Sequence, residues 1–103
     1  MEKDPKPSIA ALNDAFRRVC HPFLTPGVMF LPDLEGLIGA VRDYDDFTPD
    51  NDPYGEHEFG ALDWHGERTF WKIDYYDQSL TYGEDPLSPD CQRVLTVMLG
   101  SEY

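Results

Sequence analysis

Acid–base and metal-binding side chains gather in the short stretch Glu56-His57-Glu58, and a further histidine, His65, follows it. Imidazole and carboxylate groups are the usual general acids and bases and are common zinc ligands. Residues 58–64 read as a β-strand, which would hold His65 roughly 25 Å from His57 and so excludes a shared metal ion. A solvated or backbone-capping His57 is the favoured interpretation. A general acid and base built from Glu56 and His57 is the alternative.

The stretch just before it, DNDPYGE at residues 50–56, has part of the spacing of a calcium-binding loop. Asp50, Asp52 and Gly55 would fill positions one, three and six, but Ala61 stands at position twelve, where a bidentate glutamate is required. We favour a loop whose Asp and Asn side chains bond its own backbone amides. No metal ion and no cofactor is therefore expected, and a divalent cation enters only with the enzymatic alternative.

An activated nucleophile is not recognisable in the chain. Cys20 and Cys91 stand 71 positions apart, both in predicted helices, and the favoured interpretation is two reduced thiols. No serine or threonine lies in a glycine-rich elbow, and no glycine-rich loop has the spacing that holds phosphate. We therefore assign no catalytic residue.

Charge is the most distinctive property of this chain of 103 residues, in which 20 Asp and Glu outnumber 8 Lys and Arg and give a net charge of -12. Residues 43–90 contain 14 acidic residues and only Arg68 and Lys72, so this window carries the whole excess. Such a chain is repelled by nucleic acid and by anionic membranes. Direct binding to either one is excluded.

Composition indicates one folded domain, since 41% of the residues are hydrophobic and 14% are aromatic. We expect residues 1–7 to be disordered and residues 8–103 to form the domain. No apolar run approaches the roughly 20 residues that span a bilayer. The polar N-terminus lacks the apolar stretch of a signal peptide, which indicates a cytoplasmic protein.

Helical spacing predicts a first helix over residues 9–20, capped by Ser8. Its inward face would comprise Ile9, Leu12, Phe16 and Val19, and its outward face Asn13, Asp14, Arg17 and Arg18. A short strand at residues 28–31 and a second helix from residue 34 to about residue 44 would follow. Residues 45–55 read as a loop because they are rich in Pro, Asp and Gly.

The strongest structural signal is a hairpin of residues 58–64 and 67–75 around the two-residue turn His65-Gly66. Its register places Asp63 opposite Arg68, and Gly60 opposite Trp71, whose indole would lie over bare backbone. One face would pack on the helices and carry Leu62, Trp64, Thr69, Trp71, Ile73 and Tyr75. The other, mixed face would carry Phe59, Ala61, Asp63, Arg68, Phe70, Lys72 and Asp74.

A third strand at residues 80–82 is predicted to follow the hairpin, after a tight turn at residues 77–79. Ser88-Pro89 would then cap a final helix whose buried stripe is Cys91, Val94, Leu95, Met98 and Leu99. The predicted fold class is α+β. It has a small antiparallel sheet, made of a three-strand meander plus the short strand at residues 28–31, with three helices packed mainly on one face.

Four segments carry a resemblance that spans nearly the whole chain: ALNDAFRR, DNDPYGEHEFG, ERTFWKIDYYD and RVLTVMLGSEY. Together they resemble a family of small alphaproteobacterial proteins, often carried on plasmids and other mobile elements, that is classed as a domain of unknown function. The DPYGEH and FWKIDYYD motifs are the most specific part. The resemblance implies a bacterial, cytoplasmic, accessory role in a mobile-element setting, and it implies no reaction and no catalytic residue.

A binding protein is the leading functional hypothesis, in which acidic loops bind a basic surface of a partner protein. The candidate partner-binding residues are Asp45, Asp46, Asp50, Asp52, Tyr54, Glu56, Glu84 and Asp85. The partner would be a host defence nuclease or another DNA-binding protein, whose nucleic-acid site the acidic surface would imitate and block, in the manner of anti-restriction or anti-CRISPR proteins.

Three other interpretations stay open. In the first, the acidic residues serve solubility alone. In the second, the protein is a hydrolase or transferase that uses Glu56 or His57, with or without a divalent cation. In the third, it is an oligomeric subunit built on the mixed sheet face, where Phe59 and Phe70 either anchor a partner or pack on the sheet. The sequence does not fix the oligomeric state.

Overall fold

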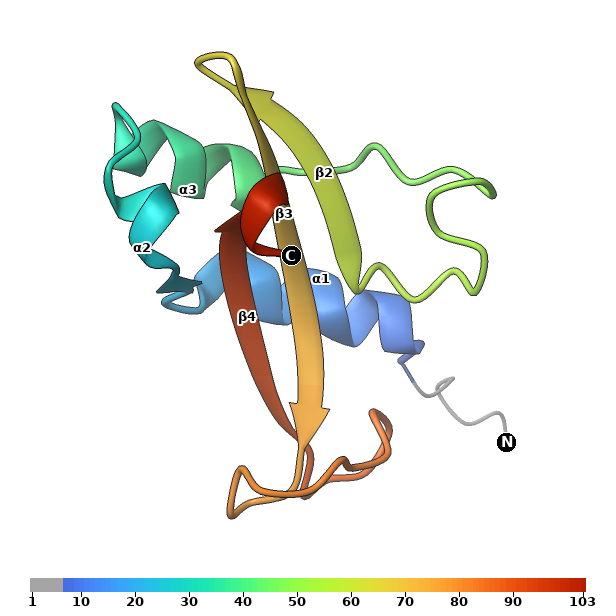
Figure 1. The fold of residues 1–103 in the computed structure, drawn as a ribbon. Coiled ribbons are helices and arrows are strands. Elements are labelled where there is room, and N and C mark those ends of the chain that lie inside the picture. The colour runs from blue at the N-terminus through green and yellow to red at the C-terminus, as the bar shows by residue number, and fades with distance from the viewer. Residues whose placement is uncertain (1–6) are drawn as a thin grey trace.

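The computed structural model describes residues 7–103, and a four-stranded sheet in the order β1-β4-β3-β2 runs through them (Figure 1). The strands are β1 (Phe23–Leu24), β2 (Phe59–Trp64), β3 (Glu67–Tyr76) and β4 (Gln92–Leu99). Strands β2, β3 and β4 form an antiparallel meander, and β1 pairs in parallel with β4. The predicted α+β fold class is confirmed. The prediction for residues 1–7 falls, apart from Pro7, outside the described residues.

Helices α1 (Ile9–Val19) and α3 (Leu34–Arg42) cover one face of the sheet, and the 3-10 turn η1 (Gly100–Glu102) lies over the other (Figure 1). The Ser8 side chain accepts a hydrogen bond from the backbone N–H of Ala11 at 3.0 Å, and Asp33 accepts one from Gly36 at 3.1 Å. These caps fix where the two helices begin; the Ser8 cap was predicted from the sequence, and the Asp33 cap was not. Among residues 7–103, no helix has the length and apolar character required to cross a membrane.

The short strand lies five residues earlier than predicted. Residues 28–31 were expected to be extended, but α2 (Pro26–Met29) is a single helical turn that buries Val28 completely. Proline favours the first helical position because its missing N–H would have no partner there. The extended residues are those of β1, where the N–H of Thr25 donates to the carbonyl of Val97 at 3.1 Å.

The segment after the hairpin corrects two further predictions. Residues 80–82 do not form a strand, because the Asp77 carboxylate accepts hydrogen bonds from the N–H groups of Ser79 and Thr81 and so folds the chain into a turn. Leu80 has a φ of 59° within this turn. The third strand of the meander is β4, which the sequence analysis predicted as a helix, and Cys91 lies in the coil before it.

Apolar residues on both faces of β4 explain the mistaken helix. Leu95 and Val97 are buried on the helix-covered face, while Met98 is buried on the opposite face. A short run that is apolar on both sides fits helical and extended spacing equally well. Pairing with β3 over eight residues decides in favour of the strand.

The hairpin follows the predicted register in every pair, including Asp63 with Arg68 and Gly60 with Trp71. The turn residues His65 and Gly66 have φ values of 48° and 86°, as a type I′ turn requires. A Cβ atom on Gly60 would lie 2.3 Å from Nε1 of Trp71, so the indole does cover bare backbone.

The hydrophobic core lies between the sheet and α3. Its buried members are Val28, Leu37, Val41, Trp71, Ile73, Leu95 and Val97. Of the hairpin side chains predicted to face the helices, Thr69, Trp71 and Ile73 are buried, and the other three are half-buried. On the mixed face, Phe59 and Phe70 pack against each other and against Tyr103, with ring centroids 5.3 to 5.7 Å apart. Cys20 and Cys91 are free thiols and half-buried, and Cys20 follows the last residue of α1.

Candidate functional site

Helix α1 turns two polar side chains into the protein, which corrects the predicted orientation of this helix. Asn13 and Arg17 are 0% and 1% exposed, whereas Val19 is 77% exposed. Arg17 donates from Nε to the carbonyl of Val41 at 3.0 Å and from Nη2 to that of Tyr44 at 2.8 Å. Carbonyls at the end of a helix lack partners within it, so the guanidinium caps the C-terminal end of α3.

Charge and aromatic contacts complete the surroundings of Arg17. Its Nη1 lies 3.0 Å from Oδ1 of Asp14, and its guanidinium carbon lies 4.8 Å from the ring centroid of Trp71 and 5.5 Å from that of Phe47. A buried cation is tolerated because it has a carboxylate, two carbonyls and two aromatic rings as partners.

Asn13 joins three parts of the chain through hydrogen bonds. Its Nδ2 donates to the carbonyl of Glu56 at 2.9 Å and to the hydroxyl of Tyr75 at 2.8 Å, and its Oδ1 accepts from Nε of Arg93 at 2.6 Å. Tyr75 in turn donates to Oε1 of Glu56 at 3.1 Å. Burial, followed by the interaction with Glu56, raises the pKa of Tyr75 to about 12, so the hydroxyl stays a donor.

His57 lies between two carboxylates. Its Nδ1 is 3.0 Å from Oδ1 of Asp14, and its Nε2 is 3.6 Å from Oδ2 of Asp52. The imidazole stacks on the Phe47 ring with centroids 3.8 Å apart and the planes 3° from parallel. Its backbone φ of 56° is in the left-handed region, which non-glycine residues adopt at some cost. The ring is thus held in place from three sides rather than solvated.

Asp52 acts inside the loop. It is only 7% exposed, and its Oδ1 accepts hydrogen bonds from the N–H groups of Glu56 at 3.1 Å and His57 at 3.3 Å. Asn51 accepts from the N–H of Thr48 at 2.8 Å in the same way. These bonds confirm the predicted self-bonded loop, and they remove the Asp52 carboxylate from the exposed surface on which it was expected.

These contacts define one polar network, whose members are Asn13, Asp14, Arg17, Asp52, Glu56, His57, Tyr75 and Arg93. Glu58 lies beside it, and burial, then the nearby charges of Glu56 and Asp52, raise the pKa of its carboxyl. In the part of the chain that the structure describes, no three His, Cys, Asp or Glu side chains are arranged to hold a metal ion.

The same network draws the acidic segments together. Residues 43–58 contain seven acidic residues and residues 77–90 contain four, and neither range has a Lys or Arg. Arg93 donates from Nη2 to the carbonyl of Pro86 at 2.7 Å, and the N–H of Glu84 donates to the carbonyl of Tyr75. Because Asn13 binds Arg93 and the carbonyl of Glu56, the two ranges are linked where Glu56 and Pro86 lie, and we name the two linked ranges the acidic end.

The two cations of the hairpin do not offset this charge, because each pairs with a neighbour. Arg68 lies 3.2 Å from Asp63, and Lys72 lies 3.1 Å from Asp74. Of the predicted partner-binding residues, Asp45, Asp46, Asp50, Tyr54 and Asp85 are exposed, and Tyr54 reaches 83%. Glu56 and Glu84 are half-buried. The structure therefore links the two ranges that hold the predicted set, with Asp52 turned inward, and it leaves the loop before β2 and the loop between β3 and β4 as separate segments (Figure 1).

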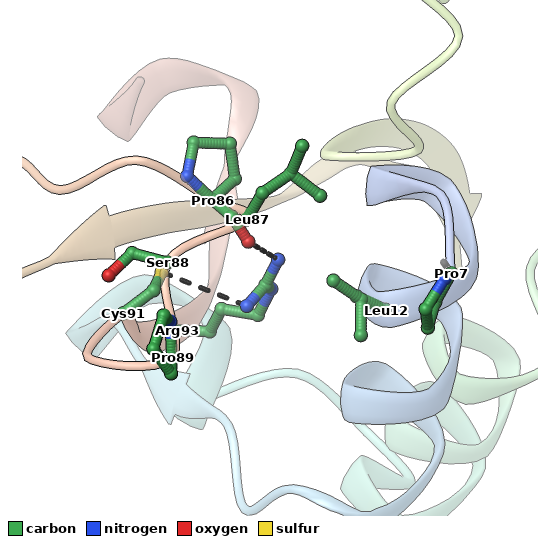
Figure 2. A pocket seen from close by; sticks show the side chains of 8 residues that line it. All are labelled: Pro7, Leu12, Pro86, Leu87, Ser88, Pro89, Cys91 and Arg93. Atoms are coloured by element: carbon green, nitrogen blue, oxygen red, sulfur yellow. Dashed lines mark hydrogen bonds between the residues drawn. The ribbon is translucent and has the colours of Figure 1, made fainter. Parts of the chain in front are cut away.

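A hollow of about 430 Å³ lies beside the network, between the start of α1 and residues 86–93 (Figure 2). Leu12 and Pro7 form one wall, and Pro86, Leu87 and Cys91 lie on the other, with the Arg93 side chain extending between them (Figure 2). Nη1 of Arg93 lies 3.7 Å from the Cys91 sulfur, so the guanidinium is occupied by three different partners.

Five members of the network were not predicted from the sequence to be functional: Asn13, Asp14, Arg17, Tyr75 and Arg93. A helical-wheel assignment placed the first three on the solvent side, since nothing local identifies their distant partners. One signal was available, because every member of the network lies within one of the four segments ALNDAFRR, DNDPYGEHEFG, ERTFWKIDYYD and RVLTVMLGSEY.

The fold and the site define a small α+β protein whose acidic loops are fastened to the sheet by buried polar side chains. Residues 24–102 match the model of the family described as "Protein of unknown function (DUF3768)", and the chain belongs to this family. The match begins after α1, which supplies Asn13, Asp14 and Arg17 to the network. No curated protein and no solved structure matches the chain.

Proposed function

We propose that this protein acts by binding, and that its acidic end docks on a basic surface of a partner protein. The partner class is a nuclease or another DNA-binding protein, whose nucleic-acid site is then blocked. In a cytoplasmic, mobile-element setting, a host defence nuclease is the partner whose inhibition would most benefit the mobile element.

One observation carries this proposal: eleven acidic residues, with no Lys or Arg among them, lie in two ranges that a buried hydrogen-bond network joins. Acidic residues that served solubility alone would not require their loops to be fastened together. Arg93 and Asn13 bind backbone carbonyls on both sides of the junction, which limits the relative movement of the two ranges.

The magnitude of the charge suits a nucleic-acid site. Duplex DNA carries one charge per about 1.7 Å of its axis, so the ten charges other than that of the inward-facing Asp52 correspond to roughly 17 Å of duplex. A fixed anionic surface also speeds the encounter with a basic partner, and this effect weakens with salt.

The test compares two variants that each remove two charges. Asp45→Asn with Asp50→Asn removes charge from the acidic end, while Glu35→Gln with Glu67→Gln removes it elsewhere, and all four side chains are exposed. Basic proteins captured from the native host at low salt and released at high salt are identified, and their affinities for each variant are measured. We expect the first variant to bind more weakly and with less salt dependence, and the control to resemble the wild type. Unchanged affinity and salt dependence in the first variant would contradict the proposal.

A second candidate function is a hydrolase or transferase, favoured by the 3.0 Å contact between Asp14 and Nδ1 of His57. A carboxylate that orients an imidazole in this way is typical of general-base catalysis. Thermal unfolding with Ca²⁺, Mg²⁺, Mn²⁺ and Zn²⁺ tests whether the enzyme would depend on a metal, because an ion that binds the folded state raises its stability. An unchanged melting temperature with all four ions would exclude a metal-dependent enzyme.

A further inference from the structure

Strand β2 forms one edge of the sheet, and no strand among residues 7–103 pairs with its outer side. The N–H of Ile73 donates to the carbonyl of Glu58 at 2.7 Å. This bond determines which residues of β2 point their backbone groups towards β3. Bonding alternates along an antiparallel strand. The backbone groups that face β3 are those of Gly60, Leu62 and Trp64. The backbone groups that face outward are those of Phe59, Ala61 and Asp63, and no hydrogen bond from residues 7–103 reaches them.

The opposite edge strand, β1, has two residues and pairs only with Thr96 and Val97 of β4. The outward carbonyl of Val97 on β4 accepts from Thr25 at 3.1 Å, and the N–H of Leu99 donates to the Glu102 carboxylate at 2.9 Å. Interactions with Thr25 and Leu99 lower the pKa of Glu102, so it remains an acceptor. Within the described residues, β2 is thus the longer of the two edge strands, with six residues against two.

Nothing in β2 protects it against strand addition. Proteins usually guard a free edge with lysine, proline or a bulge, and the strand sequence FGALDW has neither residue and pairs with β3 without a bulge. Its single charge, Asp63, is already paired with Arg68. An unguarded edge with three outward-facing residues is the geometry by which some domains bind an extended peptide.

The charge beside the edge indicates what the added strand would carry. Strand β2 directly follows residues 43–58, which hold seven acidic residues and no Lys or Arg. A second copy of this chain would bring a further net charge of -12 to the same place and be repelled. An extended basic segment would instead be attracted there.

We propose that β2 accepts an extended segment of a basic partner protein as a fifth strand. Its backbone would bond Phe59, Ala61 and Asp63, and its Lys or Arg side chains would lie past the Phe59 end, next to Glu56 and Glu58. The proposal rests on the proposed function and gives it a recognition mode, in which the backbone supplies the pairing and the acidic end supplies the preference for basic residues.

A random library of linear twelve-residue peptides, selected on the immobilised wild-type protein, tests this recognition mode. We expect the enriched peptides to carry several Lys or Arg residues towards one end and β-branched residues towards the other. Ala61→Pro removes an outward N–H without touching a bond to β3, and Ala61→Ser keeps that N–H as the matched control. The proline variant should bind the enriched peptides about five to tenfold more weakly, as expected for a lost backbone hydrogen bond, and the serine variant should bind as the wild type does.

A second measurement keeps the inference testable if Ala61→Pro does not fold. Methylating alternate backbone nitrogens of an enriched peptide removes its pairing donors, and its affinity for the wild type should fall by a similar factor. The inference would be overturned if the selection enriched no basic peptide. It would also be overturned if the enriched peptides kept their affinity both for Ala61→Pro and after backbone methylation. A dimer in solution that Ala61→Pro dissociates would also overturn it, by assigning the edge to a second copy. If the Asp45 and Asp50 variant weakens partner binding and Ala61→Pro does not, the proposed function stands without this edge.

Discussion

Gly60→Ala tests the closest approach between the hairpin and the core. The added Cβ would lie 2.3, 2.5 and 2.7 Å from three atoms of the Trp71 indole. Nonbonded heavy atoms rest at roughly 3.5 Å, so the indole or the strand would have to move by about 1 Å. Trp71 is completely buried, with Tyr44 and Phe47 edge-on at 5.4 and 6.1 Å and Arg17 over its ring, so it has no room to retreat.

The expected cost follows from these contacts. Overpacking a filled core costs about 1–3 kcal/mol, and the contact with a rigid indole places this site in the upper part of that range. Replacing glycine also restricts the unfolded chain and returns about 0.4–1 kcal/mol. We therefore expect the free energy of unfolding of Gly60→Ala to fall by about 2 kcal/mol and its Tm by about 10 °C.

Gly39→Ala is the matched control, because a Cβ there meets nothing within 4 Å in the middle of α3. Alanine stabilises a helix interior by about 0.8–1 kcal/mol relative to glycine, so this variant should unfold at a higher temperature than the wild type. Thermal and urea unfolding followed by circular dichroism would measure both variants. A Gly60→Ala protein as stable as the wild type would refute the packing of Trp71 on Gly60.

Three further changes test the polar contacts. Arg17→Met should lower the free energy of unfolding by about 3 kcal/mol in urea titration, because the Val41 and Tyr44 carbonyls lose the guanidinium donors and Asp14 loses its cation, whereas the exposed Arg18→Met on the same helix should have little effect. The raised pKa of Tyr75, about 12 against a usual 10, means that the folded state holds this proton more tightly, so stability should fall between about pH 10 and 12, and Tyr75→Phe should lessen that fall in a melting series. The lowered pKa of Glu102 has the opposite sign, so its stabilisation should be present above the usual carboxyl pKa and be lost on acidification, and Glu102→Gln should reduce this acid dependence.

Local signals predicted the hairpin and the helix starts correctly. The His65-Gly66 turn sets the register of β2 and β3, and the Ser8 and Asp33 side chains bond N–H groups only three residues away. These features are determined within a few residues, so the sequence contains what is needed to place them. The same is true of the loop at residues 45–55, whose Asn51 and Asp52 bond nearby backbone amides.

The incorrect predictions concern residues whose partners are far away in sequence. The run from Gln92 to Leu99 fits a helix as well as a strand, and pairing with β3 decides between them. Arg17 reads as a surface residue, because its acceptors, the carbonyls of Val41 and Tyr44, lie at least 24 positions further along the chain. No local pattern can show that such a partner exists.

The candidate site shows the same division between local and distant information. The sequence alone determines that residues 43–90 carry the whole net charge and that Glu56 and His57 are chemically versatile. Only the tertiary structure decides that Asp52 turns inward, that His57 stands between two carboxylates, and that Asn13 and Arg93 join two acidic ranges into one acidic end. Charge is a property of composition, whereas its arrangement on a surface depends on hydrogen bonds that span up to 80 positions of the chain.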